Sequence, residues 1–103
     1  MSGKLQLGRD AWLTSSWTFY WTVDQLAEIA THTGLIDRLQ VIEDDHLGAL
    51  DADELDGDER CELLRAIGEL PMCAARVMPD SPVRDAVLAQ LQELARMAGT
   101  APR

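Results

Sequence analysis

Asparagine is absent from this sequence of 103 residues, and lysine occurs once, as Lys4. Without asparagine there is no acceptor for N-glycosylation and no residue to complete a Cys-His-Asn catalytic constellation. A P-loop needs a lysine behind a glycine-rich loop, and Schiff-base chemistry needs an internal lysine, so the position of Lys4 argues against both. These absences exclude several familiar kinds of catalytic or modified site.

Cysteine and histidine are scarce. Cys61 and Cys73 lie twelve positions apart and match no zinc or redox spacing, so we expect both to stay reduced as small buried or half-buried side chains. The two imidazoles, His32 and His46, stand at spacings that no familiar metal-binding motif uses. We therefore expect no metal site, no catalytic residues and no cofactor.

Long apolar runs are also missing. The first ten residues lack the apolar stretch of a signal peptide, and no run approaches the roughly 18 residues of a membrane span. Hydrophobic residues make up 47% and charged residues 26% of the chain, which is typical of a globular protein. We expect a single cytoplasmic domain over residues 1–103, with a frayed tail at 100–103 and no membrane partner.

Acidic charge, in contrast, is abundant and concentrated. Eighteen acidic residues against nine basic ones give a net charge of −9, which argues against nucleic acids and anionic membranes as partners. The stretch from Glu43 to Glu62 contains ten of the acids and one base, Arg60, so the rest of the chain is neutral. We name these ten residues the acidic patch: Glu43, Asp44, Asp45, Asp51, Asp53, Glu54, Asp56, Asp58, Glu59 and Glu62.

Part of the acidic patch has the length of a calcium-binding EF-hand loop, with acids at positions 1, 3 and 12 between Asp51 and Glu62. The pattern then fails, because Leu55 occupies position 5, where an oxygen ligand is needed, and Gly57 stands one place late. We expect a solvated acidic loop that leads into a capped helix.

All five aromatic residues fall within ten positions, 12–21, interleaved with serine and threonine. Trp17, Phe19 and Trp21 alternate with more polar residues, which favours a strand, preceded by a turn at either Gly8–Asp10 or Ser15–Ser16. A helix remains an alternative, because Leu13, Trp17, Tyr20 and Trp21 also follow a helical spacing.

The aromatic rings suit either the core or an interface between proteins, since tryptophan and tyrosine bury much area at low entropic cost. We expect most of them to be interior, with Tyr20 the ring nearest the surface. The alternative is an aromatic interface that joins copies of the chain into a homodimer, formed by Trp12, Trp17, Tyr20 and Trp21.

Helical periodicity begins at Thr22, a candidate N-cap with Gln25 completing a capping box, and is expected to stop at Gly34. His32 would then stabilise the last turn of that helix through the helix dipole. A second helix is predicted over Leu35–Glu43.

Asp56 is a strong N-cap candidate, because Glu59 three residues later completes a capping box. This helix should run to about Leu70, where Pro71 ends or kinks it, and a short helix over Met72–Met78 follows. The last helix should begin with Ser81 as N-cap and Pro82 at its first position, and should close at Gly99.

These elements predict a mainly helical α+β domain, in which an N-terminal hairpin or strand packs on four or five short helices, with an all-α bundle as the alternative. The concentrated charge indicates a non-enzymatic protein-interaction module whose acidic patch docks a basic protein partner. Small inhibitors and bacterial immunity proteins share this size and acidity. The alternative function is a homo-oligomeric structural or regulatory module that associates through the aromatic segment.

Overall fold

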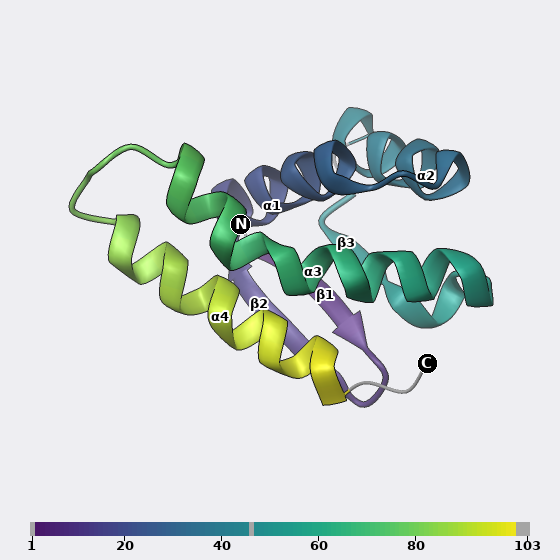
Figure 1. The fold of residues 1–103 in the computed structure, drawn as a ribbon. Helices are drawn as coiled ribbons and strands as arrows, with labels where there is room; N and C mark the ends of the chain where they lie inside the picture. The colour runs from purple at the N-terminus through teal and green to yellow at the C-terminus, as the bar shows by residue number, and fades with distance from the viewer. Residues whose placement is uncertain (1, 46, 101–103) are drawn as a thin grey trace.

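The protein is described here by a computed structural model, which covers residues 2–45 and 47–100. Within these residues the protein has three strands and four α-helices, with one 3₁₀ helix, so the predicted mainly helical α+β architecture is confirmed (Figure 1). The elements, in chain order, are β1 (Ser2–Leu7), β2 (Asp10–Ser15), α1 (Ser16–Ile29), α2 (Thr33–Asp44), β3 (Ala49–Asp51), η1 (Ala52–Glu54), α3 (Gly57–Val77) and α4 (Arg84–Thr100).

The three strands form one sheet in the order β2-β1-β3. β1 and β2 make an antiparallel hairpin in which Leu7 pairs with Asp10, and β3 lies parallel to β1 on its other side. The turn falls at Gly8, which is within the first of the two predicted positions. Gly8 has a φ of 62°, which residues other than glycine rarely adopt. Ser15 and Ser16 do not form a turn but lie where β2 gives way to α1.

The helices cover one face of the sheet. Figure 1 shows α3 lying between the α1–α2 pair and α4, with the strands behind them. Leu5, Trp12 and Leu50 point from the three strands into this layer and are buried, whereas Lys4 and Leu13 lie on the opposite, exposed face. The core is therefore a single cluster between the sheet and the helices, filled by Phe19, Val23, Leu26, Leu35, Leu39, Leu63, Ile67, Leu70, Leu91 and Leu94.

The predicted strand over residues 17–21 is wrong, because this segment is the start of α1. Ser15, not Thr22, is the N-cap, and its side chain accepts a hydrogen bond from the backbone N–H of Thr18. Thr22 lies buried inside the helix, where its hydroxyl donates to the carbonyl of Thr18 at 2.7 Å. The helix prevails because it places Phe19 in one buried stripe with the later residues Val23 and Leu26, and packing of this kind overrides strand propensity.

Two boundaries between the early helices also differ from the prediction. α1 ends at Ile29, and Gly34 does not end a helix but lies in the first turn of α2. His32 is the N-cap of α2, where its Nδ1 accepts from the N–H of Leu35 at 3.3 Å, so it begins one helix instead of closing another. An imidazole with a free ring nitrogen can accept this bond as a carboxamide or hydroxyl would.

The later helices continue past residues that commonly end helices. α3 continues through Pro71 to Val77, so the predicted short helix over Met72–Met78 is its last two turns. Leu70 and Ala74 are fully buried on either side of the proline, and this packing keeps the helix continuous. α4 begins at Arg84, two residues after Pro82, and passes through Gly99 to Thr100. The capping box of Asp56 and Glu59 is confirmed.

One glycine is fixed by close packing between the hairpin and α1. A Cβ added at Gly3 would lie 2.2 Å from Cβ of Phe19, a fully buried side chain. We predict that Gly3→Ala lowers the free energy of unfolding by about 2 kcal/mol or more, since overpacking forces the strand and helix apart. Chemical denaturation measures the change.

Gly68→Ala is the matched control, because nothing lies within 4 Å of the added Cβ on the exposed side of α3. It should stabilise the protein by about 0.5–1 kcal/mol through helix propensity. Equal effects of the two substitutions would contradict the packing of β1 on α1.

Candidate functional site

The acidic patch comes from four consecutive elements of the fold. Its residues occupy the end of α2, then β3 and η1, and finally the first turns of α3. In Figure 1 these segments run from the end of α2 at the top of the view, past β3, to the start of α3 at the right. Most of the ten side chains are exposed, Glu43, Asp51 and Glu62 are half-buried, and Glu59 is buried.

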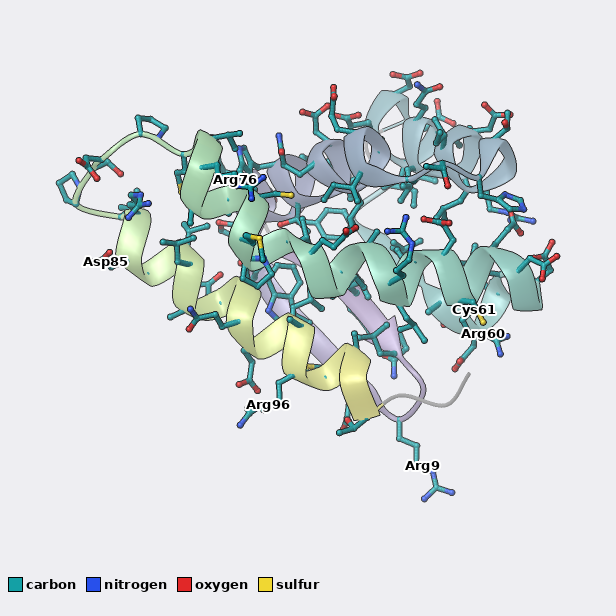
Figure 2. The ribbon with its side chains drawn as sticks, in the orientation of Figure 1. Arg9, Arg60, Cys61, Arg76, Asp85 and Arg96 are labelled. Carbon is teal, nitrogen blue, oxygen red and sulfur yellow. The ribbon has the colours of Figure 1, made fainter. Side chains whose placement is uncertain are left out.

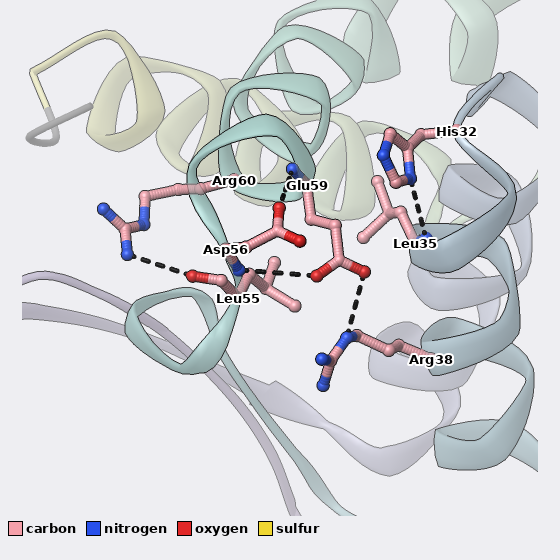
Figure 3. A network of polar contacts seen from close by, with 7 residues as sticks. All are labelled: His32, Leu35, Arg38, Leu55, Asp56, Glu59 and Arg60. Carbon is pink, nitrogen blue, oxygen red and sulfur yellow. Dashed lines mark hydrogen bonds and ion pairs between the residues drawn. The ribbon is translucent and has the colours of Figure 1, made fainter.

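Glu59 belongs to an internal network that joins α2 to α3 (Figure 3). Its Oε2 accepts from Nε of Arg38 at 3.0 Å, and its Oε1 accepts from the backbone N–H of Asp56. In turn, Oδ1 of Asp56 accepts from the backbone N–H of Glu59 at 2.8 Å. This hydrogen bond lowers the pKa of the Asp56 carboxyl. Glu59 therefore serves the fold and is not part of the exposed acidic surface.

Glu62 is also neutralised within the chain. Arg65 donates to it across one helical turn and makes a second ion pair with Glu69 at 2.7 Å. The hydrogen bond from Arg65 holds the pKa of Glu62 below its ordinary value, and the hydroxyl of Thr31 donates to the same carboxylate at 3.3 Å. The sequence assigned Glu59 to the capping box, but it gave no sign of the ion pairs that Glu59 and Glu62 make with arginines.

The basic residue within the patch leaves its acidic neighbours unpaired. Arg60 donates to the carbonyl oxygens of Ala52 and Leu55, at 3.2 and 3.1 Å, and so ties η1 to the start of α3. Within residues 2–45 and 47–100, no ion pair joins a basic side chain to the eight remaining acids of the patch. Those eight are Glu43, Asp44, Asp45, Asp51, Asp53, Glu54, Asp56 and Asp58.

A groove opens among these acids, between α2 and the β3–η1 segment, with a volume of about 390 Å³. Its floor is apolar and contains the buried side chains of Ile42, Leu50 and Leu55. Val41 and Leu47 also line it and are unusually exposed for their size, at 49% and 47%. We name this feature the acidic groove.

Carboxylates line the acidic groove beside its apolar floor. Asp51 and Glu54 contribute from the patch, and Asp37 adds one acid from outside it that the charge count did not single out. Arg38 is the basic residue of the lining, and its guanidinium pairs with Glu59. Among the described residues that line the groove there is no serine, cysteine or histidine. The combination offers apolar contact together with negative charge.

Burial and neighbouring charges act on Glu43 at the end of α2. The pKa of Glu43 is raised above its ordinary value of 4.5, first by burial and then by the charges of Asp24 and Asp44. The acids at this point are thus close enough to disfavour one another's ionisation.

The aromatic segment does not form a single surface. Trp12 is buried, and its indole N–H donates to the carbonyl of Gln90 at 3.0 Å. Tyr20 and Trp21 are half-buried against the core, with Tyr20 edge-on to Phe19. Trp17 is 60% exposed, so it, and not Tyr20, is the most exposed ring. The difference follows from the helix, which turns these side chains by about 100° per residue instead of alternating them.

The metal-binding alternatives find no support in the geometry. Asp51 caps η1 by accepting from the backbone N–H of Asp53 at 2.9 Å, and Asp56 caps α3. In the described part of the chain, no three or more histidine, cysteine, aspartate or glutamate residues are grouped so as to hold a metal ion. His46 lies outside the described residues.

The Glu59 network yields a prediction for stability. Glu59→Ala removes the ion pair and half of the capping box, so the free energy of unfolding should fall by about 2 kcal/mol. Glu59→Gln keeps a hydrogen-bond acceptor and should lose less. Glu54→Ala, at an exposed position nearby, should change stability by no more than about 0.5 kcal/mol. If Glu59→Ala matched that control, the network would not join α2 to α3 as described.

Glu43 yields a prediction for pH dependence. Because its pKa is higher in the folded protein than in the unfolded chain, folding favours the protonated form, and ionisation at neutral pH destabilises the fold. Glu43→Gln should therefore raise the free energy of unfolding at pH 7, by less than about 1 kcal/mol at this partly solvated site. The gain should disappear as the pH falls below 4.5, where the wild-type carboxyl is protonated in both states.

Asp85→Asn makes the same charge change in the first turn of α4, where the helix dipole favours an anion. It should be neutral or slightly destabilising at pH 7. A stabilisation equal to that of Glu43→Gln would mean that net charge, and not the local cluster, causes the effect.

No protein-family model, no curated protein and no solved structure matches this chain. No helix in the described residues has the length and apolar character needed to cross a membrane.

Proposed function

We propose that this protein is a non-enzymatic interaction module that docks a basic protein partner through the acidic groove, as acidic inhibitors and immunity-type proteins do. The observation that carries the proposal is the pairing of an apolar floor with unpaired carboxylates at one place in the fold. Interfaces combine buried apolar anchors with a charged rim in this way.

The carboxylates supply attraction and orientation. Eight acids that make no ion pair within the described residues lie on four consecutive elements, from α2 to the start of α3, while the sequence outside the patch is neutral overall. Such a field speeds association with basic surfaces and disfavours acidic ones. Burial raises the pKa of Glu43 first, and the charges of Asp24 and Asp44 raise it further. An opposing basic surface would relieve this repulsion between the acids.

The groove supplies the anchor. Val41 and Leu47 offer apolar surface to water, and a volume of about 390 Å³ accommodates one or two large side chains. The partner segment would therefore carry an aliphatic or aromatic residue flanked by arginine or lysine. Burying one leucine side chain contributes about 1.5–3 kcal/mol, which is enough to distinguish this mode from attraction between charges alone.

Direct titration with peptides tests both parts of the proposal. An arginine-rich peptide with one central leucine should bind at low ionic strength and should bind about tenfold or more tightly than the same peptide with serine in place of leucine. Binding should weaken as salt rises to moderate concentration, because exposed charges are screened. Isothermal titration calorimetry measures each affinity.

Two triple variants with equal net charge provide the control. Asp51→Asn/Asp53→Asn/Glu54→Gln removes three charges at the groove and should weaken binding about tenfold or more. Asp80→Asn/Asp85→Asn/Glu93→Gln removes three charges between α3 and α4 and along α4, and should weaken it no more than about threefold. Equal losses, or affinity that ignores salt, would contradict docking at the groove.

A further inference from the structure

A second surface follows the free edge of β2, where β1 is the only sheet neighbour within the described residues. α4 runs antiparallel to β2 beside this edge. Ser15, at the end of β2, lines a hollow together with Val83, and Asp10, at the start of β2, lines another together with Thr100. Leu13 is 68% exposed between them. We name this surface the β2 seam, and its exposed apolar residues are Ala11, Leu13, Trp17, Val83, Ala86 and Ala89.

The backbone of β2 is arranged to accept another strand. In a hairpin with a two-residue turn, the residues next to the turn exchange both hydrogen bonds, and bonded and non-bonded pairs then alternate. With Leu7 opposite Asp10, the bonded residues of β2 are Asp10, Trp12 and Thr14. Ala11 and Leu13 therefore direct their N–H and C=O groups to the free edge, and Ser15 directs its N–H there, because its C=O caps the start of α1.

This edge is complementary to itself. A two-fold axis at Leu13 sets Leu13 opposite its own copy, so that these two residues can exchange both hydrogen bonds in antiparallel register. The same axis sets Ala11 opposite Ser15, whose N–H can donate to the carbonyl of Ala11. The side chains of Ala11 and Ser15 are small, which leaves room for this approach. Gln90 of α4 lies at the same level, because it accepts from both Trp12 and Thr14, on either side of Leu13.

Charge along α4 fits the same axis. Asp85 and Arg96 lie eleven residues apart, about three turns, and both project from the flank of α4 that faces away from α3 (Figure 2). They stand on opposite sides of Gln90 along the helix, so a two-fold axis near Gln90 brings Arg96 of one copy to Asp85 of the other. Glu93 pairs with Arg96 in its own chain, and Ala86 and Ala89 leave space for the second helix.

We propose that a second copy of this chain pairs with the β2 seam, so that two three-stranded sheets join through their β2 edges and two α4 helices lie side by side. The acidic patch lies on other elements, α2 to the start of α3, and the like-charged chains thus meet through a surface with few net charges. This assembly is independent of the docking function, because it does not use the acidic groove.

Sedimentation equilibrium of the full chain, from low to high micromolar concentration, tests the proposal. The wild type should approach twice the monomer mass. Leu13→Pro removes an N–H that points to the free edge while sparing the bonds to β1, so it should keep its circular dichroism and weaken dimerisation about tenfold or more.

Charge reversal supplies a second, independent readout. Arg96→Asp and Asp85→Arg should each weaken the dimer several-fold, and the double variant should recover most of the loss. Asp44→Arg makes a matched charge change on α2 and should not weaken it.

A wild type that stays monomeric over the whole concentration range overturns the proposal. This holds whether the β2 edge stays unpaired or pairs with a strand of another protein. A dimer that survives Leu13→Pro and both single reversals also overturns it, because another face would then join the copies.

Discussion

The contact between Arg38 and Glu59 fixes the part of the structure on which the functional argument depends. It links α2 to the first turn of α3 across the chain segment that contains β3 and η1. The same glutamate closes the capping box with Asp56, and Arg60 ties η1 to that turn through two carbonyl oxygens. A segment with little regular structure is thereby held in place at both ends, and the acidic groove forms between it and α2.

This arrangement divides the acids by role. Glu59 and Glu62 pair with arginines and stabilise helix contacts, whereas the eight acids around them have no ion pair in the described part of the chain. Arg60, the basic residue within the patch, donates to the carbonyl oxygens of Ala52 and Leu55 instead of to these acids. Asp51 and Glu54, which make no ion pair within the described residues, thus lie beside the exposed apolar side chains of the acidic groove, and this combination supports the docking proposal.

Sequence reasoning identified the features that depend on local chemistry. The Gly8 turn, the Asp56–Glu59 capping box and the mixed architecture follow from residues close together in the chain. It failed where tertiary packing determines the secondary structure. Phe19 lies in a helix although the residues around it have strand propensity, and α3 continues through Pro71 because Leu70 and Ala74 are buried. The charge count located the patch, but the burial of Glu59 and the place of Asp37 in the groove depend on contacts between α2 and distant segments.

Docking at the acidic groove can be tested by mapping, residue by residue, where a basic ligand contacts the protein in solution. Nuclear magnetic resonance of the labelled full chain during titration with the leucine-bearing arginine peptide reports this through shifts of backbone amides. Docking at the acidic groove predicts that the largest shifts fall on Asp37 to Leu55, with Val41, Leu47 and Glu54 prominent. Shifts of similar size at Asp85 and Glu93, or shifts concentrated on the β2 seam, would contradict it.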